Sequence, residues 1–96
     1  MITMILNTIL SICCEICEIK KDDVLNNSRK TEIIFCRKIF IEIVKEKSNL
    51  TNEKIGEFIG IKKSEVGYLY KKEMNNKYYT FLLNQIRLRI KDIEDI

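Results

Sequence analysis

Residues 50–72 read LTNEKIGEFIGIKKSEVGYLYKK, and this stretch decides the fold. Thr51 is a favourable N-cap for a helix, and Glu53 lies where the positive helix end favours an acid. Gly60 ends that helix, because glycine readily adopts the positive φ that a tight turn requires. A second apolar pattern of helical spacing follows the turn. The segment therefore predicts two short helices joined by a tight turn.

The two helices have the side chains to form a small shared core, and Gly56 is placed to let their axes approach. The expected core residues are Ile55, Ile59, Ile61, Val66 and Leu69. The residues that then face outward are Lys62, Lys63, Ser64, Glu65, Gly67, Tyr68, Lys71 and Lys72. Such side chains contact phosphates and read base edges. The stretch thus resembles the helix-turn-helix of bacterial DNA-binding proteins, with an ordinary helical hairpin bearing solvated lysines as the alternative.

The rest of the chain also favours helices, because it has no proline and all three glycines lie in the segment already described. In the first helix we expect the core face to consist of Ile2, Ile5, Ile9, Ile12, Cys13 and Ile16. The other expected elements are a loop with one helical turn at 20–27, a central helix at 29–47 and an accessory C-terminal helix at about 78–94. We predict a single all-α domain over residues 1–96, a bundle of five or six helices with the helix-turn-helix at about 50–73.

A wider resemblance extends from Ile9 to Lys72. Over this range the chain is similar to the C-terminal DNA-binding domain of DnaA, the bacterial chromosomal replication initiator. In that family a first helix leads to an acidic-aliphatic turn, a basic loop, a long helix bearing an arginine and then the helix-turn-helix. The corresponding features here are Asp22–Leu25, Asn27–Lys30, Arg37 and residues 50–72. The resemblance implies a helical bundle like that family's and that of the Trp repressor.

The resemblance also implies a binding mode on double-stranded DNA. Arg29 would enter the minor groove while the second helix of the motif occupies the adjacent major groove, and Arg37 and Lys38 would help to hold phosphate. An arginine suits a narrow minor groove because of its enhanced negative potential. The predicted DNA-binding residues are Arg29, Lys30, Arg37, Lys38, Lys62, Lys63, Ser64, Glu65, Tyr68 and Lys71.

The turn departs from the family signature Gly-Gly-Arg-Asp-His-Thr-Thr. Here it reads GIKKSE over residues 60–65, which is one residue shorter and lacks the Asp-His pair that reads bases. The turn length suits general helix-turn-helix regulators equally well. The target sequence, and the choice between a role in replication and one in transcription, therefore stay open.

The composition is compatible with this function without establishing it. The net charge is +3, from 17 basic and 14 acidic residues, so the distribution of charge must decide. The chain has no histidine, which removes the usual general base and the commonest metal ligand, and it has no P-loop motif. We expect neither an enzyme nor a cofactor, metal or small-molecule substrate. The apolar start is shorter than the roughly 20 residues of a membrane span, so we expect a cytoplasmic protein without membrane association.

Three groups of residues leave alternatives open. The 4 cysteines, Cys13, Cys14, Cys17 and Cys36, could form a thiolate metal or redox site, although burial in a reducing cytosol is the simpler expectation. Among the tyrosines, Tyr68 is the best placed to contact DNA, and the others are expected in the core. Phe81 and Leu88 leave an extra apolar face on the last helix, which could seal a homodimer. The same face supports an alternative function, a protein-protein interaction module that keeps the hairpin as a scaffold.

Overall fold

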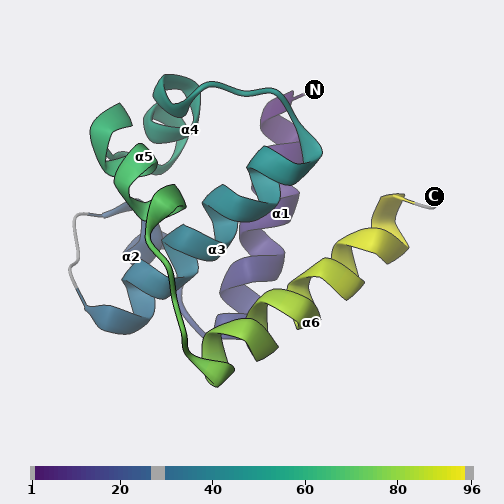
Figure 1. Ribbon diagram of the computed structural model, residues 1–96. Coiled ribbons are helices and arrows are strands. Elements are labelled where there is room, and N and C mark those ends of the chain that lie inside the picture. The colour runs from purple at the N-terminus through teal and green to yellow at the C-terminus, as the bar shows by residue number, and fades with distance from the viewer. Residues whose placement is uncertain (1, 27–29, 95–96) are drawn as a thin grey trace.

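The computed structural model describes residues 2–26 and 30–94, with six helices and no strand among them (Figure 1). The helices are α1 (Ile2–Cys17), α2 (Lys21–Leu25), α3 (Thr31–Lys47), α4 (Asn52–Ile59), α5 (Lys63–Lys71) and α6 (Lys77–Glu94). The predicted all-α bundle of five or six helices is therefore confirmed.

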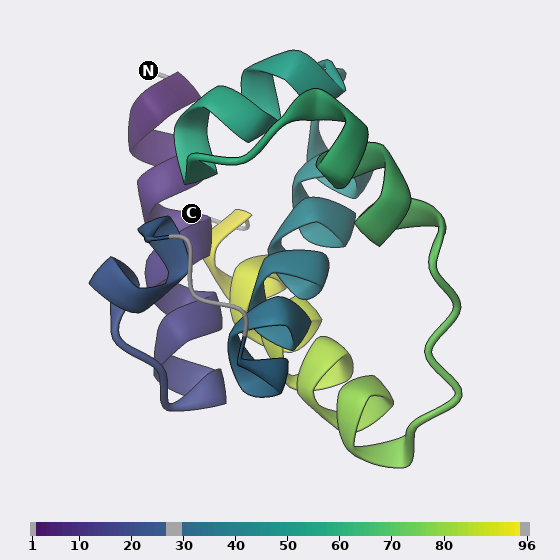
Figure 2. The same cartoon turned by 90° about the vertical axis from the view of Figure 1, so that its left-hand side faces the viewer.

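Helix α3 lies at the centre of the bundle and packs against each of the other five helices (Figure 2). Its consecutive residues Ile39, Phe40 and Ile41 are all completely buried. Three successive positions of a helix point in different directions, so only a helix with neighbours on several sides can bury all of them. This arrangement agrees with the apolar residues on more than one side of the predicted central helix.

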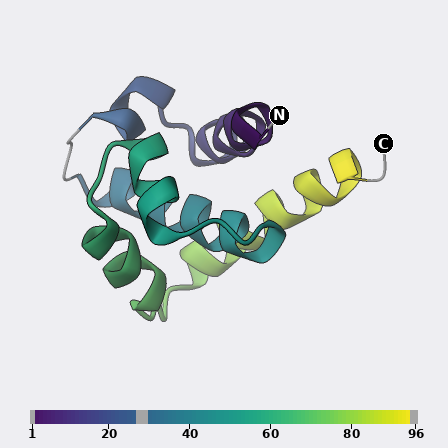
Figure 3. The same ribbon diagram turned by 90° about the horizontal axis from the view of Figure 1, so that it is seen from above.

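Helix α1 packs on α3 and α6 and buries Ile9, Ile12 and Cys13, as the sequence predicts. Ile5 is a correction, because its side chain is 55% exposed. Figures 1 and 3 show the physical reason: the C-terminal end of α6 points away from the bundle, so the first turns of α1 are left uncovered on that side.

Helix α6 buries one face against the bundle and leaves the opposite face in solvent. The buried face consists of Tyr79, Leu82, Leu83, Ile86 and Ile90. Tyr78 lies on the outer face and is exposed, and Tyr70 is exposed at the end of α5, where Lys45 Nζ lies 5.1 Å from its ring centroid. The expectation that these two tyrosines are core residues is therefore wrong, whereas it holds for Tyr79.

Candidate nucleic-acid interface

Helices α4 and α5 are joined by the tight turn that the sequence predicts. The Thr51 hydroxyl accepts a hydrogen bond from the Lys54 backbone N–H at 3.2 Å and so caps the start of α4. Gly60 ends α4 with φ of 79°, in the left-handed region that favours glycine. The backbone N–H groups of Gly60 and Ile61 both donate to the Gly56 carbonyl oxygen, at 2.8 and 3.0 Å. These bonds satisfy the end of α4 and send the chain directly into α5.

Gly56 is required by a close approach of backbone within this turn. A Cβ atom at this position would lie 2.5 Å from the Ile61 carbonyl oxygen and 3.4 Å from Val66 Cγ2. The nearest neighbour is therefore the turn itself, and α5 comes second. The sequence correctly predicts a small residue here, although the crossing of the two helix axes is not its principal cause.

The helix-turn-helix closes its core with Ile55, Ile59 and Val66, all completely buried, and with Leu69 at its edge. This packing fixes the rotation of α5 about its own axis, because one side of the helix must face α4 and α3. The residues left on the solvent side are Lys62, Lys63, Ser64, Glu65, Tyr68, Lys71 and Lys72, and each of them is exposed.

The solvent side of α5 carries a shallow depression with basic and aromatic side chains around it. Its lining consists of Ser64, Gly67, Tyr68, Lys71 and Lys72. Tyr68 is 62% exposed, and Lys72 Nζ lies 5.8 Å from its ring centroid. An ammonium over an exposed aromatic ring presents positive charge beside a flat apolar surface. Both features suit the sugar-phosphate backbone of a nucleic acid.

The predicted basic loop is only partly within the described residues. Lys30 is exposed, and its carbonyl oxygen accepts hydrogen bonds at 3.0 Å from the backbone N–H groups of Ile33 and Ile34. Lys30 is thus fixed at the start of α3. Arg29, predicted to enter the minor groove, lies outside the described residues.

Arg37 faces inward and is only 4% exposed. Its guanidinium donates to the carbonyl oxygens of Val24, from Nε at 3.0 Å, and Asn26, from Nη2, at the end of α2. Burial lowers the pKa of Arg37, and the charge of Glu65 on α5 opposes this shift. The expected phosphate contact is therefore corrected: the Arg37 guanidinium binds backbone carbonyl groups at the end of α2, just before the basic loop.

Lys38 faces inward as well and is only 2% exposed. Its ammonium donates to the carbonyl oxygens of Leu69 at 2.9 Å and Tyr70 at 3.4 Å, in the last turn of α5. It also forms an ion pair of 2.9 Å with Glu42. The three donors of a lysine ammonium are matched by three acceptors here. The expected phosphate contact is wrong for Lys38 too, because a buried ammonium that caps the end of α5 cannot reach a phosphate.

A comparison of the sequence with protein-family models finds a match over the helix-turn-helix and the helices before it. The family model described as the bacterial dnaA protein helix-turn-helix matches residues 6–72, which is well over half of the chain. The chain belongs to this family. The resemblance predicted from the sequence is thereby confirmed, and the family is that of a DNA-binding domain rather than a catalytic one. No curated protein sequence matches this chain.

The DnaA match ends at Lys72, so α6 lies beyond it. The match includes α2, α3 and both helices of the helix-turn-helix. The DnaA family match therefore includes α5 and the helices that support it. It gives no account of the exposed face of α6.

Asn52, the first residue of α4, is a polar residue of the helix-turn-helix that the sequence patterns above do not single out. Its Nδ2 would lie 3.3 Å from a Cβ atom on Gly67 of α5, and its buried Oδ1 has no hydrogen-bond partner among the described residues. The signal that could have revealed it is Gly67 itself. A glycine inside a helix, with no turn to make, indicates a close neighbour.

The cysteines of the DnaA domain lie between α1 and α3. Cys13, Cys14 and Cys36 are buried, Cys17 is half-buried, and all four are free thiols. Hydrogen bonding to Cys36 lowers the pKa of both Cys14 and Cys17. Within the described part of the chain, no three Cys, Asp or Glu side chains are arranged to hold a metal ion. The thiolate-metal alternative therefore has no ligand set there.

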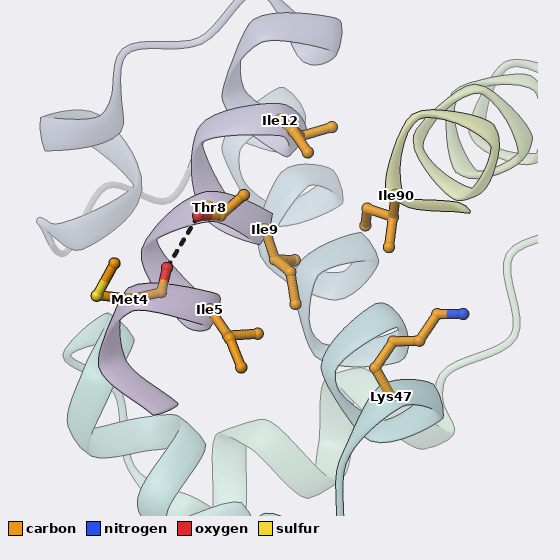
Figure 4. A pocket seen from close by; sticks show the side chains of 7 residues that line it. All are labelled: Met4, Ile5, Thr8, Ile9, Ile12, Lys47 and Ile90. Atoms are coloured by element: carbon orange, nitrogen blue, oxygen red, sulfur yellow. Dashed lines mark hydrogen bonds between the residues drawn. The ribbon is translucent and has the colours of Figure 1, made fainter. Parts of the chain in front are cut away.

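A groove opens between α1, α3 and α6 (Figure 4). Its lining is Met4, Ile5, Thr8, Ile9, Ile12, Lys47 and Ile90. The Thr8 hydroxyl donates to the Met4 carbonyl oxygen at 2.9 Å, so its polar group is satisfied within α1. The lining contains no carboxylate or thiol and thus no acid-base or nucleophilic pair. None of the described helices has the length and apolar character needed to span a membrane.

Proposed function

We propose that this domain binds double-stranded DNA, with α5 in the major groove and the basic loop before α3 in the adjacent minor groove. The observation that carries the proposal is the exposed basic face of α5 on a helix-turn-helix of the DnaA family. The proposed contact residues are Arg29, Lys30, Lys62, Lys63, Ser64, Glu65, Tyr68, Lys71 and Lys72.

The residues of this interface divide by chemistry. The lysines at the two ends of α5 neutralise phosphates and set the position of the helix on the duplex. Ser64 and Glu65, in the first turn of α5, are placed to read base edges, and a glutamate accepts from cytosine N4. Tyr68 packs on the backbone from the middle of the exposed face. Phosphate contacts supply most of the affinity, and the first turn supplies the sequence preference.

Arg37 and Lys38 support this interface from behind. Arg37 holds the end of α2, from which the basic loop starts, and Lys38 holds the last turn of α5. Each acts on a different half of the proposed contact surface, so both affect DNA binding through the shape of the domain.

The test is the salt dependence of binding, measured by fluorescence anisotropy on mixed-sequence duplex DNA. If about six phosphates are neutralised, the affinity falls on the order of a thousandfold between 50 and 200 mM salt. The double variant Arg29→Ala, Lys63→Ala should bind more weakly at low salt and show a shallower slope of log affinity against log salt. Lys91→Ala, an exposed lysine on α6, is the matched control and should bind normally. A flat salt response of the wild-type domain would refute the proposal.

The exposed face of α6 supports a second candidate function, a protein-interaction module that keeps the helical hairpin as its scaffold. Phe81 and Leu88 are exposed on a helix for which the DnaA match does not account. This function predicts that Phe81→Glu and Leu88→Glu abolish activity while Arg29→Ala and Lys63→Ala do not. Under the DNA-binding proposal the same face could instead seal a homodimer, in which the two α5 helices would read half-sites about 34 Å apart.

A further inference from the structure

The outer face of α6 carries a stripe made of Tyr78, Phe81, Gln85 and Leu88. The steps between them are three, four and three residues, which is the spacing of the seam positions at which two helices pack along their length. Tyr78, Phe81 and Leu88 are 59, 57 and 61% exposed, and Gln85 is also exposed. The stripe therefore has the pattern of a helix-packing seam without a second helix on it.

The bundle does not explain this stripe, because α6 already buries its opposite face in the core. Tyr79, Ile86 and Ile90 on that face are at most 4% exposed. An isolated exposed apolar residue would need no explanation, but several of them in seam spacing on one helix are typical of an interaction site.

The charged residues beside the stripe are basic as far as Lys91, and Asp92 and Glu94 follow in the last turn of α6. Between Met74 and Lys91 there is no acidic residue. Arg87 and Arg89 form ion pairs with Glu46 at 2.6 Å and Glu15 at 3.3 Å, which hold α6 to α3 and α1. Lys77 and Lys91 are two heptads apart, so they share one flank of the stripe, and both are exposed.

A second copy of the chain fits this face poorly. In an antiparallel pair of α6 helices, the lysine flanks of the two copies would face each other, which brings cations together. In a parallel pair, Lys77 would lie opposite Leu82, which is already buried in the bundle, so this lysine would have no acidic partner.

We propose that the outer face of α6 docks an amphipathic helix of a partner protein whose apolar stripe is flanked by aspartate or glutamate. This inference deepens the second candidate function and is independent of DNA binding through α5. The apolar stripe supplies the buried contact area, and Lys77 and Lys91 select the charge of the partner.

The test uses two synthetic helical peptides with the same stripe of leucines at seam spacing. Glutamates flank the stripe in one peptide, and lysines flank it in the other. Binding of each fluorescent peptide to the full chain is measured by anisotropy. The glutamate peptide should bind, and the lysine peptide should bind at least about tenfold more weakly. The double variant Phe81→Ser, Leu88→Ser should bind the glutamate peptide at least about tenfold more weakly than wild type. Circular dichroism verifies that this variant is folded.

The charge-reversed variant Lys77→Glu, Lys91→Glu provides the decisive arm, because it should prefer the lysine peptide. Equal binding of both peptides, or of neither, would overturn the proposal. Two other results would also overturn it: a concentration-dependent dimer of the wild-type chain, or its binding to a single-stranded oligonucleotide, if the Phe81→Ser, Leu88→Ser variant loses that association. Lys63→Ala should keep peptide binding while it weakens DNA binding, so the two proposals fail separately.

Discussion

The ammonium of Lys38 lies 2.9 Å from the carbonyl oxygen of Leu69, and this bond ties the end of α5 to α3, the central helix of the bundle. The last carbonyl groups of a helix have no partner within it. Lys38 supplies a donor to two of them, at Leu69 and Tyr70, from a side chain that is itself buried. The position of α5 on the surface therefore depends on a lysine that does not reach the surface.

Replacing Lys38 with Met should consequently affect stability and not the number of phosphate contacts. We expect the free energy of unfolding to fall by about 1–3 kcal/mol, because two carbonyl groups of α5 lose their donor. The slope of log affinity against log salt should stay at the wild-type value. Chemical denaturation and anisotropy measure the two quantities.

Lys63→Ala is the matched control for this prediction, because Lys63 is exposed on α5. It should change stability by less than about 0.5 kcal/mol and reduce the salt slope by about one. A reduced slope at normal stability in Lys38→Met would instead show that Lys38 contacts phosphate.

Gly56 and Gly67 should respond oppositely to substitution by alanine. Gly56→Ala places a Cβ atom 2.5 Å from the Ile61 carbonyl oxygen, which belongs to backbone, so we expect a loss of about 1–3 kcal/mol. Gly67→Ala meets only the Asn52 amide, a side chain with freedom to shift, at 3.3 Å. Because alanine favours a helix over glycine, this variant should be neutral or up to about 1 kcal/mol more stable. Thermal unfolding separates the two, and equal losses in both would contradict this account.

Local features of the site were predictable from the sequence and distant ones were not. Thr51, Gly56 and Gly60 define the turn within a few residues, and their roles depend on backbone conformation that each residue type favours or forbids. Lys38 meets its carbonyl partner 31 residues along the chain. The local sequence around Lys38 does not distinguish a buried side chain from an exposed one. Only the packing of α5 on α3 buries it.

Glu18 should be replaceable by glycine with a gain in stability. It follows the end of α1 with φ of 58°, and it is the only non-glycine residue with positive φ within the described ranges 2–26 and 30–94. A residue with a Cβ atom pays roughly 1–2 kcal/mol for this conformation. Glu18→Gly should therefore raise the free energy of unfolding by about 1 kcal/mol. Ser11→Gly, at an exposed position within α1, should lower it by about 0.5 kcal/mol, and a gain there as well would contradict the argument.

Tyr79 gives a prediction that depends on pH. Its hydroxyl is buried and has no hydrogen-bond partner among the residues described, while its ring packs edge-on against Phe35 at a centroid distance of 6.0 Å. Burial raises the pKa of Tyr79 well above its ordinary value, and the Glu42 carboxylate adds to the shift. Tyr79→Phe keeps the ring contact and removes the unpaired hydroxyl. At pH 7 it should be as stable as wild type or about 1 kcal/mol more stable.

The sign of the pH effect follows from the direction of this pKa shift. In the unfolded chain Tyr79 titrates near its ordinary pKa of about 10, whereas the folded state holds it neutral to higher pH. The resulting stabilisation is fully present below about pH 10 and is lost as the pH rises from there through the folded pKa. Tyr79→Phe has no phenol to ionise at this position, so its stability should decline less steeply above about pH 10 than that of wild type. Tyr78→Phe, at the exposed neighbouring position, should keep the wild-type decline, and parallel curves for wild type and Tyr79→Phe would show that the phenol is not held neutral by the fold.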